Sequence, residues 1–376
     1  MRLYRWLSDF HGSERKIALA IGNFDGFHVG HQAVIAQMQA KARAHNLLSA
    51  VMIFEPQPLE FFGRGQASAA TAVSAAPAAA ASAPASASAP ASASAPASAS
   101  APASASAPAA ASAPVDVSAA AAVSARTAAV PARLFTIRDK LRIFRAAGID
   151  IVFCMTFTRK FAALSDVEFV AMLERMQVKS VTVGSDFSFG RGGAYHIAEL
   201  EAACAARDIE CSAIGKVEAQ GVRISSTMLR SLIVKGDFST AAKFMGRPYS
   251  IAGRVVHGNA IGRTIGFPTA NINLNRLVCP LSGVYAVKVA CRYGHFDGVA
   301  NVGHRPTITI PTLHSLLEVN IFNFDADLYG QEIEVTFVHK IRDEVKFENL
   351  NALIAQISAD KERAQYLLSL EAQDLP

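Results

Sequence analysis

The pattern of apolar and polar positions divides the chain into two parts. In the first part, continuous apolar runs alternate with stretches of helix-forming composition. The runs are Ile17–Ile21, Ser49–Phe54, Asp150–Met155 and Ser180–Gly184. Helices are expected over Gln32–Ala44, over Ile137–Ala147, from Ser165 to about Met176, and over Ala194–Ala206. Strands that alternate with helices predict a parallel α/β sheet.

From Gly246 onward, apolar and polar residues alternate one by one. The clearest case is Gln331–Phe337, where every second residue is apolar, as expected of a strand with one buried face. Further strands are expected over Tyr249–Val256, Val284–Cys291 and Leu316–Phe324, and an amphipathic helix over Phe347–Leu368. This part therefore predicts a small antiparallel β-barrel or sandwich with a terminal helix. Lys235–Lys243 is interpreted as the link, which gives domains at residues 1–236 and 243–376.

Residues 65–132 interrupt the first domain with a segment made mostly of Ala, Ser and Pro. Proline recurs every six residues from Pro84 to Pro114, and no charged residue occurs between Arg64 and Asp116. A membrane span is disfavoured, because Ala is weakly hydrophobic and periodic Pro leaves backbone groups unsatisfied in lipid. The composition instead predicts a disordered insert with some polyproline II structure.

Charge and cysteine content narrow the class of protein. The formal net charge of +5 suits phosphate ligands, but no block of Lys and Arg requires nucleic acid. The five cysteines form no Cys-x-x-Cys pair, so we expect reduced thiols in a cytoplasmic protein rather than a zinc site. Asp9 and Glu14 precede the first apolar run, which argues against a signal peptide.

The first candidate site is the stretch Ile21–Gln32, which reads IGNFDGFHVGHQ. It joins a buried strand to a helix through Gly22 and Gly26, with His28 and His31 where the helix opens. Free N–H groups and the helix dipole favour anions at such a junction. The sequence therefore predicts a phosphate site here.

Two later stretches point to the same end of the sheet. The loop Gly184–Gly190 follows a predicted strand, and ligands of open α/β sheets bind beyond the carboxyl ends of the strands. Taken alone, the loop fits a turn with two inward Phe residues equally well. In Ile224–Arg230, a Ser should cap a helix whose first turns carry Thr227 and Arg230, which suits a phosphate group.

These motifs resemble those of a known family. His28–His31 matches the HxGH signature of the nucleotidylyltransferase superfamily, and GNFDGFHVGH is similar to bacterial bifunctional riboflavin kinase/FMN adenylyltransferases. The resemblance implies a Rossmann-like nucleotidylyltransferase domain whose two His residues bind ATP phosphates. It further implies ATP or phosphate contacts from Asn23, Gly26, Ser225, Ser226, Thr227 and Arg230, and flavin contacts from Asp186 and Phe187. Gln57 departs from the family pattern, which usually has His there.

The stretch Gly253–Asn271 carries the second set of motifs. Its glycines and Arg263 suit phosphates, although the Lys and the spacing of a P-loop are missing. The stretch resembles the riboflavin kinase signature, which ends in PTAN. The resemblance implies ATP contacts from Gly258, Gly262 and Arg263, Mg²⁺ ligands at Thr269 and Asn271, and a catalytic glutamate at Glu318. Gly283–Ala286 and Asn301–Thr307 match further blocks of this family.

The resemblance thus predicts a bifunctional enzyme that uses ATP as a co-substrate and Mg²⁺ as a cofactor. The C-terminal domain is expected to phosphorylate riboflavin to FMN, and the N-terminal domain to adenylylate FMN to FAD with release of pyrophosphate. Its ligands are riboflavin, FMN, FAD and ATP; no nucleic acid, membrane or obligatory protein partner is expected. Two alternatives stay open: an enzyme with only one active half, and a non-catalytic flavin-binding protein.

Overall fold

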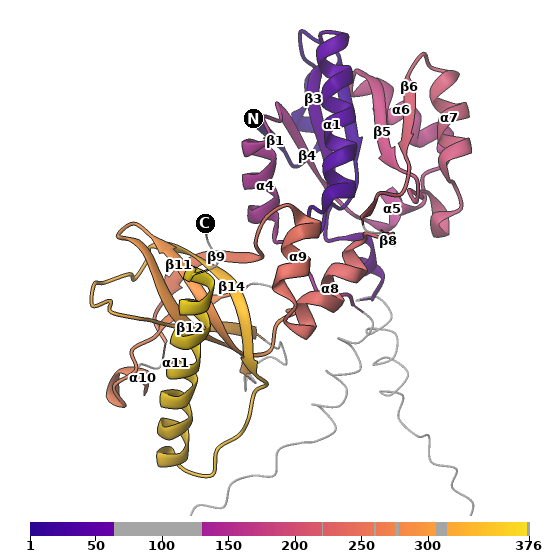
Figure 1. Cartoon of the computed structure of the whole chain (residues 1–376). Coiled ribbons are helices and arrows are strands. Elements are labelled where there is room, and N and C mark those ends of the chain that lie inside the picture. The colour runs from indigo at the N-terminus through magenta and orange to yellow at the C-terminus, as the bar shows by residue number, and fades with distance from the viewer. Residues whose placement is uncertain (64–129, 220, 259–260, 275–277, 306–313, 374–376) are drawn as a thin grey trace, which may run out of the picture.

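The computed structural model describes residues 1–63, 130–219, 221–258, 261–274, 278–305 and 314–373. These residues form an N-terminal α/β lobe and a C-terminal barrel lobe, which lie side by side (Figure 1). The predicted disorder of the insert falls almost entirely outside the described residues. Val130 is already buried, so the ordered chain resumes before the expected end of the insert at residue 132.

The α/β lobe is built on a six-stranded sheet in the order β1-β4-β3-β2-β5-β6, in which every neighbouring pair is parallel. The strands are β1 (Arg2–Tyr4), β2 (Ile17–Ile21), β3 (Leu48–Glu55), β4 (Ile151–Thr156), β5 (Val178–Gly184) and β6 (Glu210–Ile214). The parallel sheet and its four predicted strands are confirmed. β1 and β6 were not predicted, because they are short edge strands whose residues are mostly exposed or half-buried.

Helices cover both faces of this sheet. They are α1 (Val29–Ala44), α4 (Ile137–Ala146), α5 (Arg159–Ala162), α6 (Asp166–Arg175) and α7 (Ile197–Ala205). The four predicted helices are confirmed, and a capping box of Ser165 and Glu168 begins α6. All five residues of β2 are buried, because the strand has a helical layer on each side.

Two further helices follow the sheet and lead to the barrel. A hairpin of β7 (Glu218–Ala219) and β8 (Val222–Arg223) precedes α8 (Ser226–Lys235), and α9 (Phe238–Met245) comes next. The predicted link Lys235–Lys243 thus consists largely of α9. Its Phe238, Phe244 and Met245 are buried, so this connection is packed into the core rather than extended.

The barrel lobe is a closed antiparallel barrel in the order β10-β13-β12-β11-β14-β9, which decides between the barrel and the sandwich. Its strands are β9 (Ser250–Val256), β10 (Ala270–Asn273), β11 (Gly283–Cys291), β12 (Gly294–Arg305), β13 (His314–Ile321) and β14 (Glu332–Arg342), and α10 (Ile261–Thr264) is a single turn. As predicted, Ile333, Val335 and Phe337 of β14 are buried inside.

The terminal helix α11 (Leu350–Gln373) lies against the outer surface of the barrel. Figure 1 shows it in yellow, running in front of the barrel strands and extending beyond them. Ala364 and Leu368 of the helix pack with Val284, Ala286 and Val299 of the barrel in a small core of their own. The predicted helix is confirmed, although it begins three residues later than expected.

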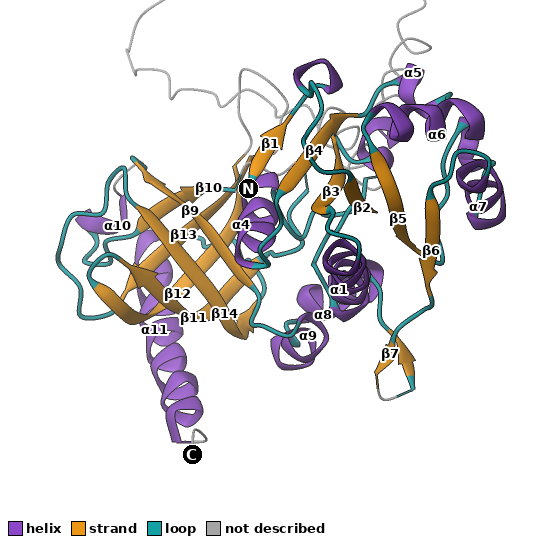
Figure 2. Ribbon diagram, turned by 90° about the horizontal axis from the view of Figure 1, so that it is seen from above, coloured by secondary structure: helices purple, strands orange, loops and turns teal. Residues whose placement is uncertain are grey.

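The two lobes share one hydrophobic core, which lies between α4, α8, α9 and the barrel (Figure 2). The rings of Phe135 and Tyr249 stack with centroids 6.2 Å apart, and Tyr249 donates a hydrogen bond to the carbonyl of Leu134. The guanidinium of Arg247 lies 4.7 Å from the centroid of the Phe135 ring. These contacts fix the barrel against the start of α4.

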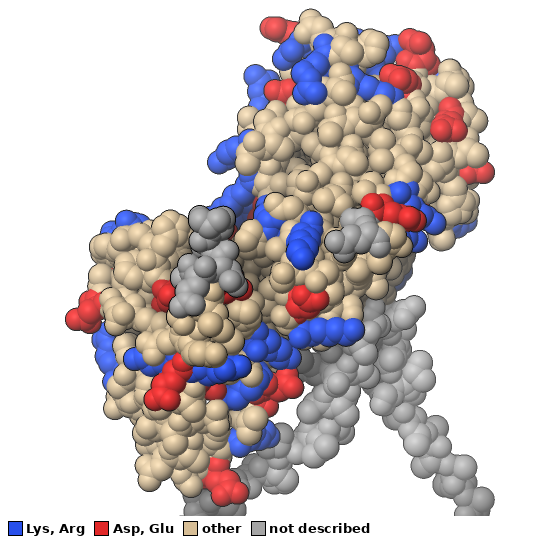
Figure 3. Space-filling view, in the orientation of Figure 1, with Lys and Arg blue, Asp and Glu red and all other residues tan. Residues whose placement is uncertain are grey.

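On the face shown in Figure 3, charged side chains are scattered, and several Lys and Arg groups lie where the two lobes meet. Among the residues that the structure describes, no helix has the length and apolar character that crossing a membrane requires.

Candidate active sites

The first site lies where β2 turns into α1. His28 is the N-cap of α1, and its Nδ1 accepts a hydrogen bond from the backbone N–H of His31 at 3.4 Å. The two imidazole rings stack with centroids 3.8 Å apart. A Cβ at Gly30 would lie 3.1 Å from the His28 ring, so a glycine leaves room for this arrangement. The structure thus brings the two predicted His residues together.

Burial keeps both imidazoles neutral. It lowers the pKa of His28 to about 4, although the nearby Asp186 and Asp25 carboxylates oppose this shift. Burial also lowers the pKa of His31 well below 6.5, and the neighbouring His28 and Lys140 act in the same direction. Because Nδ1 of His28 is an acceptor, the proton of the neutral ring is assigned to Nε2, which is left to donate.

The turn before His28 contains a glycine with positive φ, and two buried polar atoms in and beside the turn have no hydrogen-bond partner among the described residues. Gly26 has φ of +82°, and a Cβ there would lie 2.7 Å from Leu134 and 2.8 Å from Leu229. Within the described part of the chain, Asn23 Oδ1 and His31 Nδ1 are buried without a hydrogen-bond partner. Since unsatisfied buried polar atoms are costly, these two are suited to meeting a ligand.

The start of α8 supplies hydroxyl groups beside this turn. Ser225 caps the helix by accepting a hydrogen bond from the N–H of Met228, as predicted for a Ser at this place. Ser226 Oγ donates to the Asp25 carbonyl at 2.7 Å, which joins α8 to the β2–α1 turn. Thr227 is exposed, and no residue that the structure describes hydrogen-bonds its hydroxyl.

Arg230 has a structural task that the sequence did not reveal. Its Nη2 lies 2.7 Å from Asp25 Oδ2, and its Nε donates to the Ala132 carbonyl at 2.6 Å. Asp25 is 2% exposed and also accepts from the N–H groups of Leu134 and Phe135. The guanidinium is therefore partly used in holding α8 and the start of α4 against the turn.

The predicted flavin residues follow β5. Asp186 is exposed and pairs with Arg223 at 3.1 Å. The ring of Phe187 is half-buried and stacks on Phe189 with centroids 5.7 Å apart. The charge of Asp186 acts on the pKa of His28, so this loop and the His pair lie in one region at the carboxyl edge of the sheet. Phe189 is buried, as expected of an inward Phe.

The second site is a row of side chains across three barrel strands. Glu318 of β13 is paired in register with Asn271 of β10 on one side and with Asn301 of β12 on the other. Directly opposed residues of antiparallel strands point to the same face, with Cβ atoms about 4.5–5.5 Å apart. Leu317 and Val319 are buried in the barrel, so this row of side chains faces outward.

This row lines a cavity of about 350 Å³ between the barrel and α11. Apolar residues form much of its wall, including Val284 of the barrel, Ile357 of α11 and Phe347 from the segment that joins them. Arg342 of β14 is bound to Asp360 of α11 by hydrogen bonds of 2.7–3.1 Å, which hold the helix over the cavity. A mostly apolar cavity with a few polar groups is typical of a small-molecule site.

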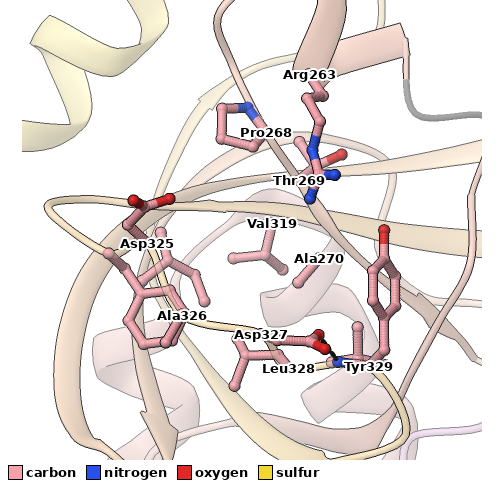
Figure 4. Close-up of a pocket in the computed structure, with 13 residues that line it drawn as sticks. Arg263, Pro268, Thr269, Ala270, Val319, Asp325, Ala326, Asp327, Leu328 and Tyr329 are labelled. Carbon is pink, nitrogen blue, oxygen red and sulfur yellow. Dashed lines mark hydrogen bonds between the residues drawn. The ribbon is translucent and has the colours of Figure 1, made fainter.

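A second cavity of about 370 Å³ lies on the other side of Thr269, which lines both cavities. Figure 4 shows Arg263 extending beside Thr269, with Asp325, Asp327 and Tyr329 across the cavity. Gly262 and Arg263 belong to the helical turn α10 rather than to an irregular loop. The turn is closed by a hydrogen bond from Phe267 N–H to the Gly262 carbonyl.

The residues around Asn271 suit a divalent cation. Asn271 is 6% exposed, and its Oδ1 has no hydrogen-bond partner among the described residues, while its Nδ2 donates to the Thr269 carbonyl. A Cβ at Gly258 would lie within 3 Å of this amide, so only glycine leaves the approach open. Hydroxyl and amide oxygens are ligands that Mg²⁺ accepts, together with waters and substrate phosphates.

Two family models match separate parts of the chain. A family model described as FAD synthetase matches residues 11–76 and 118–228, and one described as riboflavin kinase matches residues 245–368. The gap in the first match falls within the Ala/Ser/Pro segment.

Relatives match over nearly the full length. A bifunctional riboflavin kinase/FMN adenylyltransferase of Haemophilus influenzae is 38% identical over 97% of this chain and 98% of the relative. One of Escherichia coli K12 is 34% identical over 98% of this chain and 99% of the relative. A crystal structure described as that of a macrolide-efflux protein from Streptococcus pneumoniae matches with a TM-score of 0.65 and 26% identity. It covers 96% of this chain and 98% of that chain.

Proposed function

The chain belongs to the bifunctional riboflavin kinase/FMN adenylyltransferase family, and from this premise we propose which residues carry each of its two reactions. The enzyme phosphorylates riboflavin to FMN and adenylylates FMN to FAD. We assign the first reaction to the outward row of the barrel and the second to the carboxyl edge of the α/β sheet.

In the kinase step, riboflavin occupies the cavity between the barrel and α11, whose apolar walls suit its ring system. ATP occupies the cavity beside Arg263. Gly258, which lies against the Asn271 amide, and Gly262, which lines the neighbouring cavity, are proposed to contact its phosphates from that side. The 5′-hydroxyl oxygen attacks the γ-phosphorus, Glu318 accepts the hydroxyl proton, and ADP leaves. The position of Thr269 between the two cavities supports this arrangement, because the phosphoryl group must pass from one ligand to the other.

Thr269 and Asn271 would hold Mg²⁺ with the phosphates of ATP. The observation that supports this assignment is the buried Asn271 Oδ1, which has no partner among the described residues. When bound, Mg²⁺ neutralises charge on the transferring phosphoryl group. Asn271 is paired with Glu318 across neighbouring strands, so the residue that would hold the metal and the proposed base lie side by side on the barrel.

In the adenylyltransferase step, a phosphate oxygen of FMN attacks the α-phosphorus of ATP, and pyrophosphate leaves. No protein nucleophile is needed, so positioning and charge stabilisation carry the reaction. His28 and His31 act as neutral donors to phosphate oxygens, because burial lowers the pKa of both. Asn23, Gly26, Ser225 and Thr227 complete the phosphate contacts, and Ser226 contributes its backbone N–H, because its hydroxyl donates to the Asp25 carbonyl. Arg230 contributes its remaining N–H groups, and Asp186 and Phe187 contact the flavin.

We further propose that the enzyme works in the cytoplasm, with riboflavin, FMN, FAD and ATP as its ligands. The five cysteines are free thiols, which fits a reducing compartment.

One experiment decides between the proposal and the two alternatives. The purified chain is incubated with ATP and Mg²⁺ and either riboflavin or FMN, and the flavins are separated. The proposal predicts FMN and FAD from riboflavin, and FAD from FMN. A chain with one active half makes only one of these conversions, and a flavin-binding protein makes neither.

A further inference from the structure

A third cavity, of about 680 Å³, lies between the two lobes and contains none of the residues assigned to either reaction. From the α/β lobe, it is lined by β1 and the residues after it, by the ends of β3 and β4, and by the start of α4. From the barrel, β9 and β10 line it. Figure 2 shows β1 and α4 facing these two strands. The volume falls in the range of about 300–1,000 Å³ that small-molecule sites have.

The cavity carries positive charge that the protein does not neutralise. Arg5 lines it and makes no hydrogen bond or ion pair with any residue that the structure describes. Arg254 lines it from the barrel, and its guanidinium donates to the neutral Gly330 carbonyl. Arg133 is different, because Glu55 and Glu60 already balance its charge. Guanidinium groups with free N–H donors are the usual partners of phosphate.

An aromatic ring lies beside these guanidinium groups. Trp6 is the only tryptophan of the chain, lines the cavity and is 58% exposed. Its indole packs against no aromatic ring of the described residues. Leu3 is also exposed at the cavity. An exposed indole next to apolar residues is suited to stacking on a planar ligand.

We propose that this cavity is a third flavin site, which binds FMN outside both catalytic sites. A ligand with a planar ring and a phosphate monoester matches Trp6 and Arg5 together. The choice of FMN rests on the proposed function, since FMN alone must leave the barrel site and enter the α/β site. The cavity touches elements of both sites: Asn273 follows Asn271 on β10, and Glu55 ends β3 at the carboxyl edge of the sheet.

The chain offers a matched pair of substitutions. The side chains of Leu3 and Arg5 line the cavity. Tyr4, between them, points to the other side, where it packs with Phe10 and Phe153. Arg2 is exposed and does not line the cavity. Arg5→Glu and Arg2→Glu therefore make the same charge change three residues apart, and only the first reaches the cavity. Arg5→Lys keeps the positive charge.

The test is to titrate the full chain with FMN, without ATP and Mg²⁺, and to follow the emission of Trp6. We expect saturable quenching in the wild type. Arg5→Glu should raise the FMN concentration for half-quenching at least tenfold, while Arg2→Glu and Arg5→Lys stay within about threefold of the wild type. Riboflavin, which lacks the phosphate, should quench the wild type and Arg5→Glu alike.

Other results would overturn the inference. If AMP or inorganic phosphate displaces FMN at concentrations as low as those at which FMN itself binds, the site does not recognise the flavin ring. If Arg5→Glu changes no FMN titration, no such site exists. If Arg5→Glu slows FAD formation from saturating FMN, the cavity belongs to the catalytic site. The proposed function is tested separately on the same samples, because it fails only if the wild type lacks one of the two activities.

Discussion

Single residues show that the two sites handle charge differently. In the α/β lobe, charge is buried in pairs such as Asp25 and Arg230, and the two imidazoles beside them are neutral. In the barrel, half-buried Glu318 faces the buried amide of Asn271. The first site therefore offers hydrogen-bond donors to phosphates, while the second offers a proton acceptor and a metal ligand.

Asn271 allows a direct test of the metal site. Asn271→Ala should raise the Mg²⁺ concentration for half-maximal FMN formation, because few protein ligands hold the metal and one of them is lost. The measurement is a Mg²⁺ titration of FMN formation from riboflavin. FAD formation from FMN serves as the control and should keep its Mg²⁺ dependence. An unchanged titration of FMN formation would remove Asn271 from the metal site.

His28 predicts a pH dependence of stability. Its pKa is lowered from 6.5 to about 4 by burial, so the unfolded chain binds this proton more readily than the folded chain. The contribution of the neutral His28 imidazole to stability is present in full above pH 6.5 and is lost as the pH falls from 6.5 towards 4. Between pH 7 and pH 5, the free energy of unfolding should fall by roughly 2 kcal/mol more in the wild type than in His28→Gln. Urea unfolding at both pH values measures this, and equal losses would contradict the neutral imidazole.

Among the helices and strands, the sequence predicted those features that are set by residues close together in the chain. The apolar run of β2, the Ser225 cap of α8 and the alternation along β14 are local patterns, and each one is found in the structure. Contacts between distant segments left no such pattern. The pairing of Arg230 with Asp25 and the row that joins Glu318 to Asn301 depend on how helices dock and how strands align. For the same reason, α9 was interpreted as a link.

The effect of removing the Ala/Ser/Pro insert can be predicted from the residues at its two ends. Arg133, just after the segment, forms hydrogen bonds with Glu55 and Glu60, just before it, and Glu60 is 3% exposed. These hydrogen bonds hold the two ends of the insert together. Each doubling of the length of a closed loop costs only about 0.6 kcal/mol of closure free energy. Replacing residues 65–129 with a short Gly/Ser linker should leave both activities within about twofold of the wild type. Flavin product assays and limited proteolysis measure the outcome, and a folded variant without FAD formation would make the insert part of the adenylyltransferase.

In the whole molecule, each lobe is proposed to carry one reaction although the two lobes share a core. Phe135 of the α/β lobe stacks on Tyr249 just before the barrel begins, and Phe238 of α9 stacks on Tyr249 in the same core. The assigned residues nevertheless belong to separate elements: β2, α1, β5 and α8 carry one set, and α10, β10 and β13 carry the other. Substitutions in one set should therefore spare the other reaction.

The most direct test measures both products in two variants. His31→Ala and Glu318→Gln are each assayed for FMN formation from riboflavin and for FAD formation from supplied FMN. We predict that His31→Ala makes FMN at the wild-type rate but almost no FAD. Glu318→Gln should form FMN roughly 10²–10⁴-fold more slowly, because its amide cannot accept the proton, and should still convert FMN to FAD. Loss of both activities in either folded variant would contradict the assignment of one reaction to each lobe.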